Sequence, residues 1–466
     1  MSDILLTHAY FIGEDEAERK VMKPYPPLGL LYISSHLKRC GFSVEVLDTT
    51  FQYPSSTCEA IARSNARIIG LYVNLITRRY ALKLIAACKA HGRIVILGGP
   101  EPVNYAEEYL DHGADIIVSG EGELTLAELI PHLQRHGLSR LDEINGIAFR
   151  SKNGEVSRTA PRAQIRDLDA QPFPDRGAID LESYLTTWQR HHGVRSVSLI
   201  TARGCPYACN WCSHSVYGRS HRRRSPANVV DEIEAIRGAY APDQLWFADD
   251  VFTINHRWLT EFAGEMKRRG LRYPFETITR EDRLNEDVAE ILAELGCYRI
   301  WIGAESGSQR ILDAMTRRTN AARTREMIGL VQRKGIRAGT FIMLGYDGET
   351  WSDIDETARH LRNSVPDDML TTLSYPIKGT PYYDRVASRI SSREPWAEST
   401  DRTLVISGRN SRRFYRHAQR WLAAETSLAG MTARRERDVV RYAKTKAASA
   451  LNRLGMYATR HEVDRG

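Results

Sequence analysis

The sequence predicts an α/β chain with two parallel sheets and a helical C-terminal region. Short apolar runs alternate with amphipathic segments over residues 1–135, and again over about 195–390. Strand–helix alternation of this kind is typical of parallel sheets covered by helices. Of the 466 residues, 42% are hydrophobic and 26% are charged, which is ordinary for a globular protein with room for two or three domains. Beyond residue 390 the pattern is helical and basic.

Five strand–helix repeats are expected in the first 135 residues. Apolar runs predict strands at 4–7, 43–47, 68–73, 94–97 and 116–118. Amphipathic segments predict helices at 28–40, about 57–65, 79–90, 105–112 and 124–133. Pro26 and Pro27 before the first helix and Gly41 after it are typical boundary residues. Because ligands of parallel sheets bind beyond the carboxyl ends of the strands, we expect the functional residues in the loops after these strands.

Residues 136–190 are predicted to connect the two sheets. A hairpin is expected between 144–149 and 156–158, across the turn at Asn153-Gly154, and residues 171–175 are expected to be an extended linker. Within 191–390, strands are predicted at 197–201, 244–248, 275–279, 298–303, 339–344 and 370–375. Six such repeats favour a partial (β/α)6 barrel with its site at the carboxyl ends of the strands. Residues 391–466 form the helical, basic tail.

Three cysteines lie directly after the strand predicted at 197–201. Cys205, Cys209 and Cys212 have the spacing C-x3-C-x2-C. Three thiolates ligate three irons of a [4Fe–4S] cluster and leave the fourth iron open to another ligand. A zinc site with His214 or His221 as the fourth ligand is an alternative, and disulfides or chance spacing are further ones. The remaining cysteines are scattered, which argues against disulfides.

With Trp211 just before the last cysteine, this loop resembles the signature of the radical S-adenosylmethionine (SAM) superfamily. The resemblance implies that the open iron binds SAM and that electron transfer cleaves SAM to a 5′-deoxyadenosyl radical. The segment Gly303–Ser308 is similar to the SAM-contacting turn of that family. From these matches and from the carboxyl ends of the predicted strands, the SAM-binding residues expected are Trp211, Asp249, Arg280, Glu305, Ser306 and Gly345. For Asp249 and Asp250, helix capping is the alternative.

The N-terminal region resembles the cobalamin-binding domain found before some radical SAM domains. The matching segments are Pro26–Tyr32, Gly98-Gly99-Pro100 and Gly120–Glu123. The resemblance implies a flavodoxin-like, doubly wound sheet and bound cobalamin. The cobalamin-binding residues expected are Leu28, Asn74, Thr77, Gly98, Gly99, Glu121 and Gly122. The Asp-x-His-x-x-Gly motif of other such domains is absent, so cobalamin is expected without a histidine from that motif beneath cobalt. Glu101 stands where many relatives carry histidine.

The remaining features bear on location and partners. The N-terminus has no signal-peptide pattern and no apolar run reaches the ~20 residues of a membrane span, so a cytoplasmic protein is expected. Cys40, Cys58 and Cys88 lie in or at predicted helices and are interpreted as buried thiols, which disfavours a second cluster and methylthiolation. The net charge of +7 is concentrated in the tail, which we interpret as a solvated helical face.

These observations favour a cobalamin-dependent radical SAM methyltransferase. It would move a methyl group from methylcobalamin to an unactivated carbon, with a [4Fe–4S] cluster, SAM and cobalamin as cofactors. The partners expected are a small-molecule biosynthetic substrate and a low-potential electron donor, whereas nucleic acid is disfavoured. One alternative is a cyclase or rearrangement enzyme of the same family. Another is an RNA-modifying or RNA-binding protein that uses the basic tail.

Overall fold

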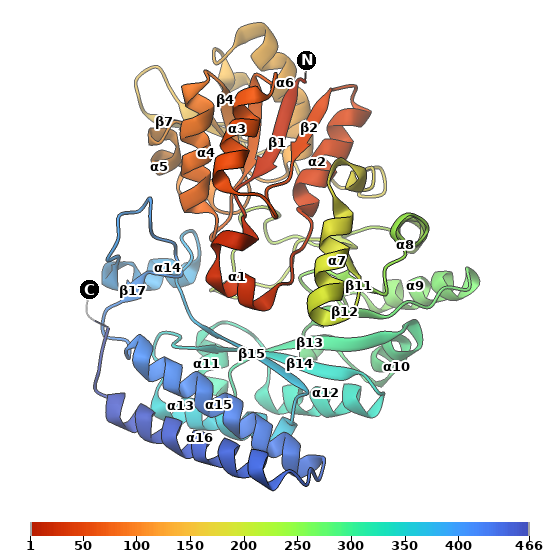
Figure 1. The fold of residues 1–466 in the computed structure, drawn as a ribbon, viewed down its shortest axis with the longest axis vertical. Helices are drawn as coiled ribbons and strands as arrows, with labels where there is room; N and C mark the ends of the chain where they lie inside the picture. The colour runs from red at the N-terminus through yellow and green to blue at the C-terminus, as the bar shows by residue number, and fades with distance from the viewer. Residues whose placement is uncertain (1, 465–466) are drawn as a thin grey trace. The chain divides into compact units, whose positions relative to one another are not determined.

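The computed structural model describes residues 2–464 in two compact units. The first unit holds the chain up to Pro206 together with Ser213–Asp243 and Glu394–Thr400. The second holds Tyr207–Cys212, Gln244–Arg393 and the chain from Asp401 onward. Figure 1 shows the elements of both units along the chain.

The first unit is built on a seven-stranded sheet in the order β2-β1-β3-β4-β5-β6-β7. The strands are β1 Ile4–His8, β2 Val44–Leu47, β3 Ile68–Tyr72, β4 Ile94–Gly98, β5 Ile116–Val118, β6 Ile147–Arg150 and β7 Val156–Arg158. The first five strands are parallel, whereas β6 and β7 are antiparallel. The predicted hairpin therefore does not stand apart as a connector but extends the sheet at one edge.

Alternating side chains of these strands fill two separate cores. Leu5 of β1 packs into one core, while Ile4 and Leu6 pack into the other, because successive side chains point to opposite faces of a sheet. Helices α3 (Pro54–Arg63), α4 (Arg78–Ala90) and α5 (Ala106–Asp111) contribute to the first core, and α2 (Leu28–Arg39) and α6 (Gly122–His136) to the second. The sheet is thus doubly wound, as the sequence predicts.

Helices α1 (Glu16–Val21) and α7 (Leu181–His192) of the first unit are not expected from the sequence analysis. Helix α1 follows β1, and α7 lies within the predicted connector. Asp180 caps the start of α7, accepting a hydrogen bond from the Ser183 backbone N–H, and Gly193 ends it in the left-handed conformation. Helix α8 (Pro226–Tyr240) begins after Ser225, whose side chain caps it by accepting a hydrogen bond from the Asn228 backbone N–H.

The second sheet has six strands in the order β15-β14-β13-β12-β11-β8. These are β8 Ser196–Leu199, β11 Gln244–Phe247, β12 Phe275–Thr279, β13 Cys297–Glu305, β14 Arg337–Leu344 and β15 Asp368–Leu373. The helices that follow are α9 His256–Arg268, α10 Glu286–Leu295, α11 Gln309–Ala314, α12 Ala321–Arg333, α13 Trp351–Ser364 and α14 Pro381–Val386. Two-stranded pairs are formed by β9 Ala202–Arg203 with β10 Arg222–Arg223, and by β16 Ile390–Ser391 with β17 Val405–Ile406. The pairings from β11 to β15 are parallel, and the strand order is that of an open, partial barrel.

The tail forms two long helices, α15 (Arg412–Ala433) and α16 (Val439–Thr459). They pack against each other, and α15 also packs against α13 (Figure 1). Trp421 and Leu422 of α15 and Met456 of α16 are fully buried in a shared core. The helical tail is therefore confirmed. Among residues 2–464, none of the helices combines the length and apolar character needed to cross a bilayer.

Candidate cofactor sites

The three cysteines lie on one loop that follows β8 and β9. None of the three forms a disulfide. Gly204, just before Cys205, has a φ of +85°, and a Cβ there would lie 2.4 Å from the carbonyl oxygen of Ser220. Glycine is therefore required at this position, both by conformation and by space. Within the described residues no three His, Cys, Asp or Glu side chains converge as a metal site, so the cluster ligands remain a prediction.

Buried ion pairs fix the start of the loop within the first unit. Arg203 of β9 donates to Glu121 and to Glu123 at 2.7 Å each, and Arg222 of β10 donates to Glu121 at 2.7 Å. Breaking one member of a buried ion pair strands its partner and costs about 3–5 kcal/mol. Glu121, predicted to bind cobalamin, is thus occupied by two arginines that anchor the strands flanking the cysteine loop.

Two buried guanidinium groups face Cys209 in the second unit. Nη1 of Arg280 lies 3.8 Å from the Cys209 Sγ, and Nη1 of Arg317 lies 3.7 Å from it. Arg280 is 1% and Arg317 7% exposed. Positive charge at this distance favours a negatively charged iron–sulfur cluster. Cys209 therefore lies in the kind of environment that suits a cluster ligand.

Both arginines are held in place by further contacts. Arg280 donates to Asp282 at 2.9 Å and to the Arg317 carbonyl at 3.0 Å, and its guanidinium lies 3.7 Å from the centre of the Tyr207 ring. Arg317 donates to the Gly303 carbonyl at 2.8 Å. Arg280 was predicted from its place after β12. Arg317 was missed, because it lies in the turn between α11 and α12 rather than at a strand end.

Glu305 ends β13 in a strained conformation. Its φ is +63°, and the register of β13 against β14 shifts between Gly303 and Glu305. Burial raises the pKa of Glu305, opposed by Arg317, whose Nη2 lies 3.9 Å from its carboxylate. Non-glycine residues adopt this conformation rarely, at a cost of about 1–3 kcal/mol, and they concentrate at functional sites. Burial likewise raises the pKa of Glu281, so two buried carboxyl groups accompany the two arginines.

The other predicted SAM residues occupy the carboxyl ends of neighbouring strands. Gly345 follows β14 with a φ of +73° and donates its N–H to Glu349 at 2.6 Å. Trp211 packs against the cluster of Met343 and Tyr346 beside it. The Ser306 hydroxyl is used within its own turn and accepts from the Ser308 N–H at 3.1 Å.

Asp249 and Asp250 follow β11. Asp249 is buried and Asp250 is exposed. The alternative that these residues cap the next helix is wrong, because Asn255 caps α9 and accepts from the Trp258 N–H. The role of Asp249 in binding SAM remains a prediction.

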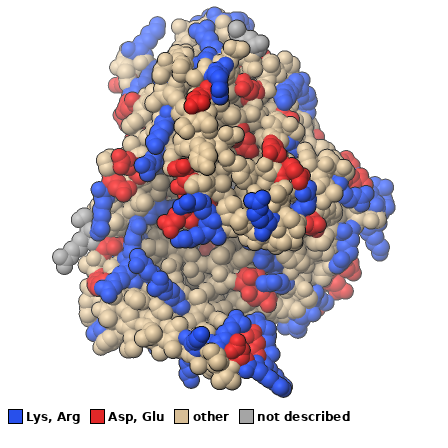
Figure 2. Space-filling model, in the orientation of Figure 1, with Lys and Arg blue, Asp and Glu red and all other residues tan. Residues whose placement is uncertain are grey.

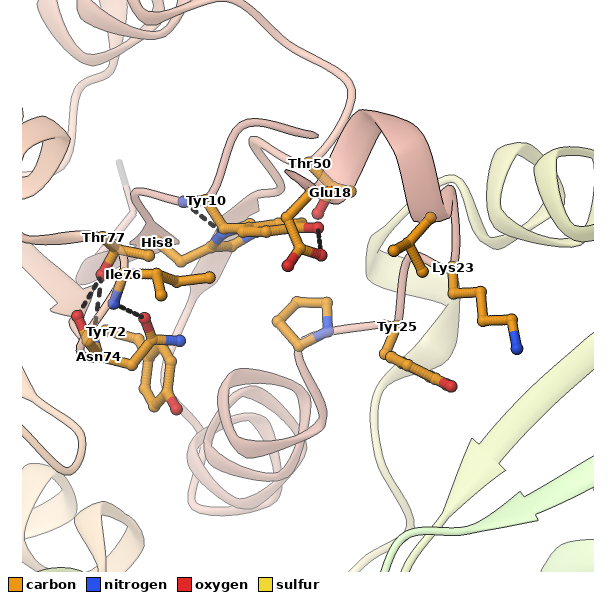
Figure 3. A pocket seen from close by; sticks show the side chains of 12 residues that line it. His8, Tyr10, Glu18, Lys23, Tyr25, Thr50, Tyr72, Asn74, Ile76 and Thr77 are labelled. Atoms are coloured by element: carbon orange, nitrogen blue, oxygen red, sulfur yellow. Dashed lines mark hydrogen bonds between the residues drawn. The ribbon is translucent and has the colours of Figure 1, made fainter. Parts of the chain in front are cut away.

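A cavity of about 380 Å³ opens in the first unit at the carboxyl ends of β1 and β3 (Figure 3). The sheet order changes direction here, since β1 lies between β2 and β3, and ligands of doubly wound sheets bind at such a point. Asn74 and Thr77, both predicted from the sequence, lie in its wall. The full lining is His8, Tyr10, Glu18, Val21, Lys23, Tyr25, Pro27, Thr50, Tyr72, Asn74, Ile76 and Thr77.

Several polar side chains in this wall are hydrogen-bonded to other protein groups. His8 contacts Asp48 through Nε2 at 2.8 Å and accepts the Tyr10 N–H through Nδ1 at 3.2 Å. Tyr10 donates its hydroxyl to Glu18 at 2.9 Å. Both ring nitrogens of His8 are therefore engaged. The wall combines tyrosine, aliphatic and polar side chains, and its one histidine has both nitrogens engaged, which fits a cobalamin held without histidine beneath cobalt.

Two of the predicted glycines serve the protein's own packing. A Cβ at Gly99, whose φ is +107°, would lie 2.3 Å from the Val73 carbonyl oxygen, and one at Gly122 would lie 2.9 Å from the Ile33 side chain. Gly98 has no atom within 4 Å of such a Cβ. Gly98 therefore keeps an open side, as does Leu28, which is half-buried at the start of α2.

Two family models match the chain. The B12 binding domain matches residues 19–130, and the Radical SAM superfamily matches residues 199–361. The chain belongs to the cobalamin-dependent radical SAM enzymes. These domains imply a [4Fe–4S] cluster, SAM and cobalamin as cofactors, and enzymes of this kind act on small molecules with the help of a reductant. The Cys209 thiol beside two guanidinium groups, and the cavity at the switch point, provide chemistry that fits these cofactors.

Known proteins similar to this radical SAM enzyme include methyltransferases and a cyclase. An uncharacterized methyltransferase of Pyrococcus horikoshii is 27% identical over 83% of this chain and 84% of its own length. The anaerobic magnesium-protoporphyrin IX monomethyl ester cyclase of Cereibacter sphaeroides is 27% identical over 78% of this chain, which spans 61% of that protein. The structure of the radical SAM methyltransferase TsrM from Kitasatospora setae, with cobalamin and a [4Fe–4S] cluster, shares the fold with a TM-score of 0.69 at 19% identity, covering 86% and 78% of the two chains.

The cysteines outside the loop differ in their surroundings. Cys88 is fully buried, Cys58 is half-buried and Cys40 is exposed. The prediction of a buried thiol is thus wrong for Cys40, which lies at the exposed end of α2. Burial raises the pKa of the Cys88 thiol to about 12, so this side chain behaves as a small apolar residue.

Proposed function

We propose that this enzyme transfers a methyl group from cobalamin to an unactivated carbon of a small molecule. The observation that carries the proposal is that one chain combines a cysteine loop facing two buried arginines with a doubly wound sheet whose switch-point cavity offers no free histidine. We assign residues 1–135 to cobalamin, 136–190 to the connector, 191–390 to the radical SAM domain and 391–466 to the helical basic region.

When bound, the cluster and SAM supply a 5′-deoxyadenosyl radical, and cobalamin supplies the methyl group. Cys205, Cys209 and Cys212 would hold the cluster, and Arg280 and Arg317 would stabilise its negative charge. The strained Glu305 would orient the polar groups of SAM, with Asp249, Ser306 and Gly345 as further contacts and Trp211 against the adenine. Burial of both arginines and of Glu305 keeps water away from these groups.

The switch-point cavity would hold one end of cobalamin. Its volume of about 380 Å³ lies near the lower end of the roughly 300–1,000 Å³ typical of small-molecule sites, so it fits a part of this large cofactor rather than the whole. Asn74 and Thr77 line this cavity, and Leu28, Gly98, Gly99, Glu121 and Gly122 stay candidates around it. Since His8 has both nitrogens engaged, we expect no imidazole on cobalt.

The test uses SAM with a deuterated methyl group. The anaerobic enzyme, with its cluster reconstituted and cobalamin loaded, is reduced and given the labelled SAM without substrate. Mass spectrometry should find the label on cobalamin together with an equal amount of S-adenosylhomocysteine. The Cys209→Ala variant is the matched control for chemistry at the cluster. Absence of cobalamin binding would refute the assignment of residues 1–135.

A cyclase is the second candidate, favoured by the similarity to the cyclase of Cereibacter sphaeroides. This chain spans 61% of the length of that cyclase. The same experiment separates the two. Deoxyadenosine that forms while cobalamin stays unlabelled favours cyclisation. RNA modification is the third candidate, and it requires RNA retention at low salt that arginine substitutions in the tail abolish.

A further inference from the structure

The last helix of the chain carries an apolar face that contacts solvent. Along α16, Val439 is 76% exposed, Val440 64%, Leu451 67%, Leu454 65% and Tyr457 58%. Four alanines of the same helix are also exposed: Ala443, Ala447, Ala450 and Ala458. Scattered exposed leucines are ordinary in proteins, but a continuous row of this kind is not.

These side chains share one side of the helix. At 100° per residue, positions 440, 443, 447, 450, 451, 454 and 458 fall within one stripe along α16. The opposite side contains Ser449, Met456 and Thr459, which are buried where α16 packs on α15. The helix is therefore already anchored by one face, and its second apolar face has no partner within residues 2–464.

Positive charge borders the exposed apolar stripe. Residues 439–461 contain no Asp or Glu, and their basic residues are Arg441, Lys444, Lys446, Arg453 and Arg460. Arg441 pairs with Glu436 at 3.1 Å and Arg453 with Asp355 at 3.5 Å. Lys444 and Lys446, on either side of the stripe, form no ion pair within the described residues. In Figure 2 the region of α15 and α16 contains uncharged surface with Lys and Arg around it and some Asp and Glu among them at the bottom of the view.

We propose that α16 docks on an anionic lipid surface. A helix lies in the membrane interface when an apolar face is flanked by lysine and arginine, because the face inserts between acyl chains while the cations meet lipid phosphates. A protein partner or a second copy would need an acidic surface around a matching apolar groove. Lipid supplies both features at once, and it requires no complementary shape. The cysteine loop and the switch-point cavity take no part in this contact.

The test measures co-sedimentation of the anaerobic full-length holoenzyme with vesicles. Phosphatidylcholine vesicles are compared with vesicles containing about one quarter phosphatidylglycerol, at low and high salt. We expect binding to the anionic vesicles that weakens with salt. Leu451→Glu/Leu454→Glu should lower the partition coefficient at least about tenfold, and Lys444→Gln/Lys446→Gln should lower it by a similar factor. Leu138→Glu, at an exposed loop leucine, is the matched control and should bind like the wild type.

Four results would overturn lipid docking. The first is no binding to anionic vesicles at low salt by a wild-type protein with intact circular dichroism and iron content. The second is equal binding by the Leu451→Glu/Leu454→Glu variant. The third is a dimer in lipid-free buffer, seen by light scattering, that this variant dissociates, since it would assign the face to a second copy. Retention of RNA that depends on Lys444 and Lys446 but not on the two leucines would assign the charge to nucleic acid instead.

Discussion

Each of the two parallel sheets has its candidate site at the carboxyl ends of its strands, but the side chains that form the two sites differ in charge. At the carboxyl ends of the second sheet, buried Arg280 and Arg317 lie beside Cys209, and Glu305 is strained. At the carboxyl ends of the first sheet, His8 and Tyr10 are hydrogen-bonded to protein partners around an open cavity. The site of the second sheet therefore concentrates buried charged side chains, whereas the polar side chains named in the first sheet are hydrogen-bonded to protein partners.

This difference follows from what each edge would hold. An anionic cluster and the zwitterionic end of SAM need fixed charges, and charges preorganised in a dry site act strongly because little solvent screens them. Cobalamin is a large corrin ring whose rim carries neutral amide groups, for which shape and a hydrogen-bonding wall matter more than fixed charge. The parallel sheet thus supplies the position of a site, while the loop residues supply its electrostatics.

The largest effect is expected at the charged edge. Cys209→Ala should remove the cluster and abolish SAM cleavage, since two cysteines leave two irons without protein ligands. Iron content, absorbance of the cluster and 5′-deoxyadenosine are measured anaerobically. Cys40→Ser, which changes an exposed thiol at the end of α2, should leave all three unchanged. Retained deoxyadenosine formation by Cys209→Ala would refute the ligand assignment.

Removing the charge of Arg317 tests whether buried charge at the second sheet acts on the cluster. Arg317→Gln removes a cation 3.7 Å from the Cys209 Sγ, and should shift the cluster midpoint to a more negative potential by something on the order of 100 mV, given ~4 kcal/mol for two charges 4 Å apart near a protein surface. Arg317→Lys keeps the charge and should shift the potential less. Redox titration followed by electron paramagnetic resonance measures both. Equal potentials for the wild type and Arg317→Gln would show that this guanidinium does not act on the cluster.

The sequence predicted where the strands end, and so where the two sites lie, better than it predicted the side-chain contacts within each site. Apolar periodicity located the strands because a buried parallel strand is an uninterrupted apolar run, and Glu305 and Arg280 were found because they follow such runs. Arg317 was missed because it lies in a turn between helices, and nothing in Arg317-Arg318 distinguishes it from a surface pair. The pairing of His8 with Asp48 joins residues 40 positions apart, which local patterns do not reveal.

The two glycines at the end of β4 show the same limit of sequence-based prediction. Gly98 and Gly99 were both expected to bind cobalamin, and the space around Gly99 is filled by the neighbouring strand end. A glycine signals that something lies close, and only the fold shows what that is. Helix α7 was missed for a related reason, because its amphipathic pattern follows a proline-rich extended stretch that was read as part of one long connector.

Carboxyl groups at the two edges should respond to pH with opposite sign. Burial raises the pKa of Glu349, beside Gly345, to about 8, although the Gly345 N–H opposes this. Burial also acts on Asp48, but hydrogen bonds from His8, the Thr50 N–H and Tyr184 outweigh it and lower the pKa. Glu349 therefore stabilises the fold below its ordinary pKa and loses this contribution as pH rises toward 8. Asp48 stabilises the fold above its ordinary pKa and loses its contribution as pH falls through the lowered value.

Denaturant unfolding of two variants over a range of pH tests these signs. Glu349→Gln should gain stability over the wild type by about 3 kcal/mol between pH 5 and 8. Asp48→Asn should lose about 1–3 kcal/mol at neutral pH, with the difference disappearing in acid. If the free energies of unfolding of wild type and variant differ by the same amount at every pH, the carboxyl group does not have the pKa shift given above. This holds for either variant.

The smallest effect separates the two neighbouring glycines at the carboxyl end of β4 in the first sheet. Gly99→Ala puts a methyl group against the Val73 carbonyl at a φ of +107°, and should lower the free energy of unfolding by about 1–3 kcal/mol. Gly98→Ala meets no atom within 4 Å, so thermal unfolding should stay within about 0.5 kcal/mol of the wild type. If cobalamin packs on the end of β4, the Gly98→Ala methyl group should still weaken cobalamin binding in equilibrium dialysis. Unchanged binding would move the cofactor away from β4 and leave the walls formed by β1 and β3 as its contact with the sheet.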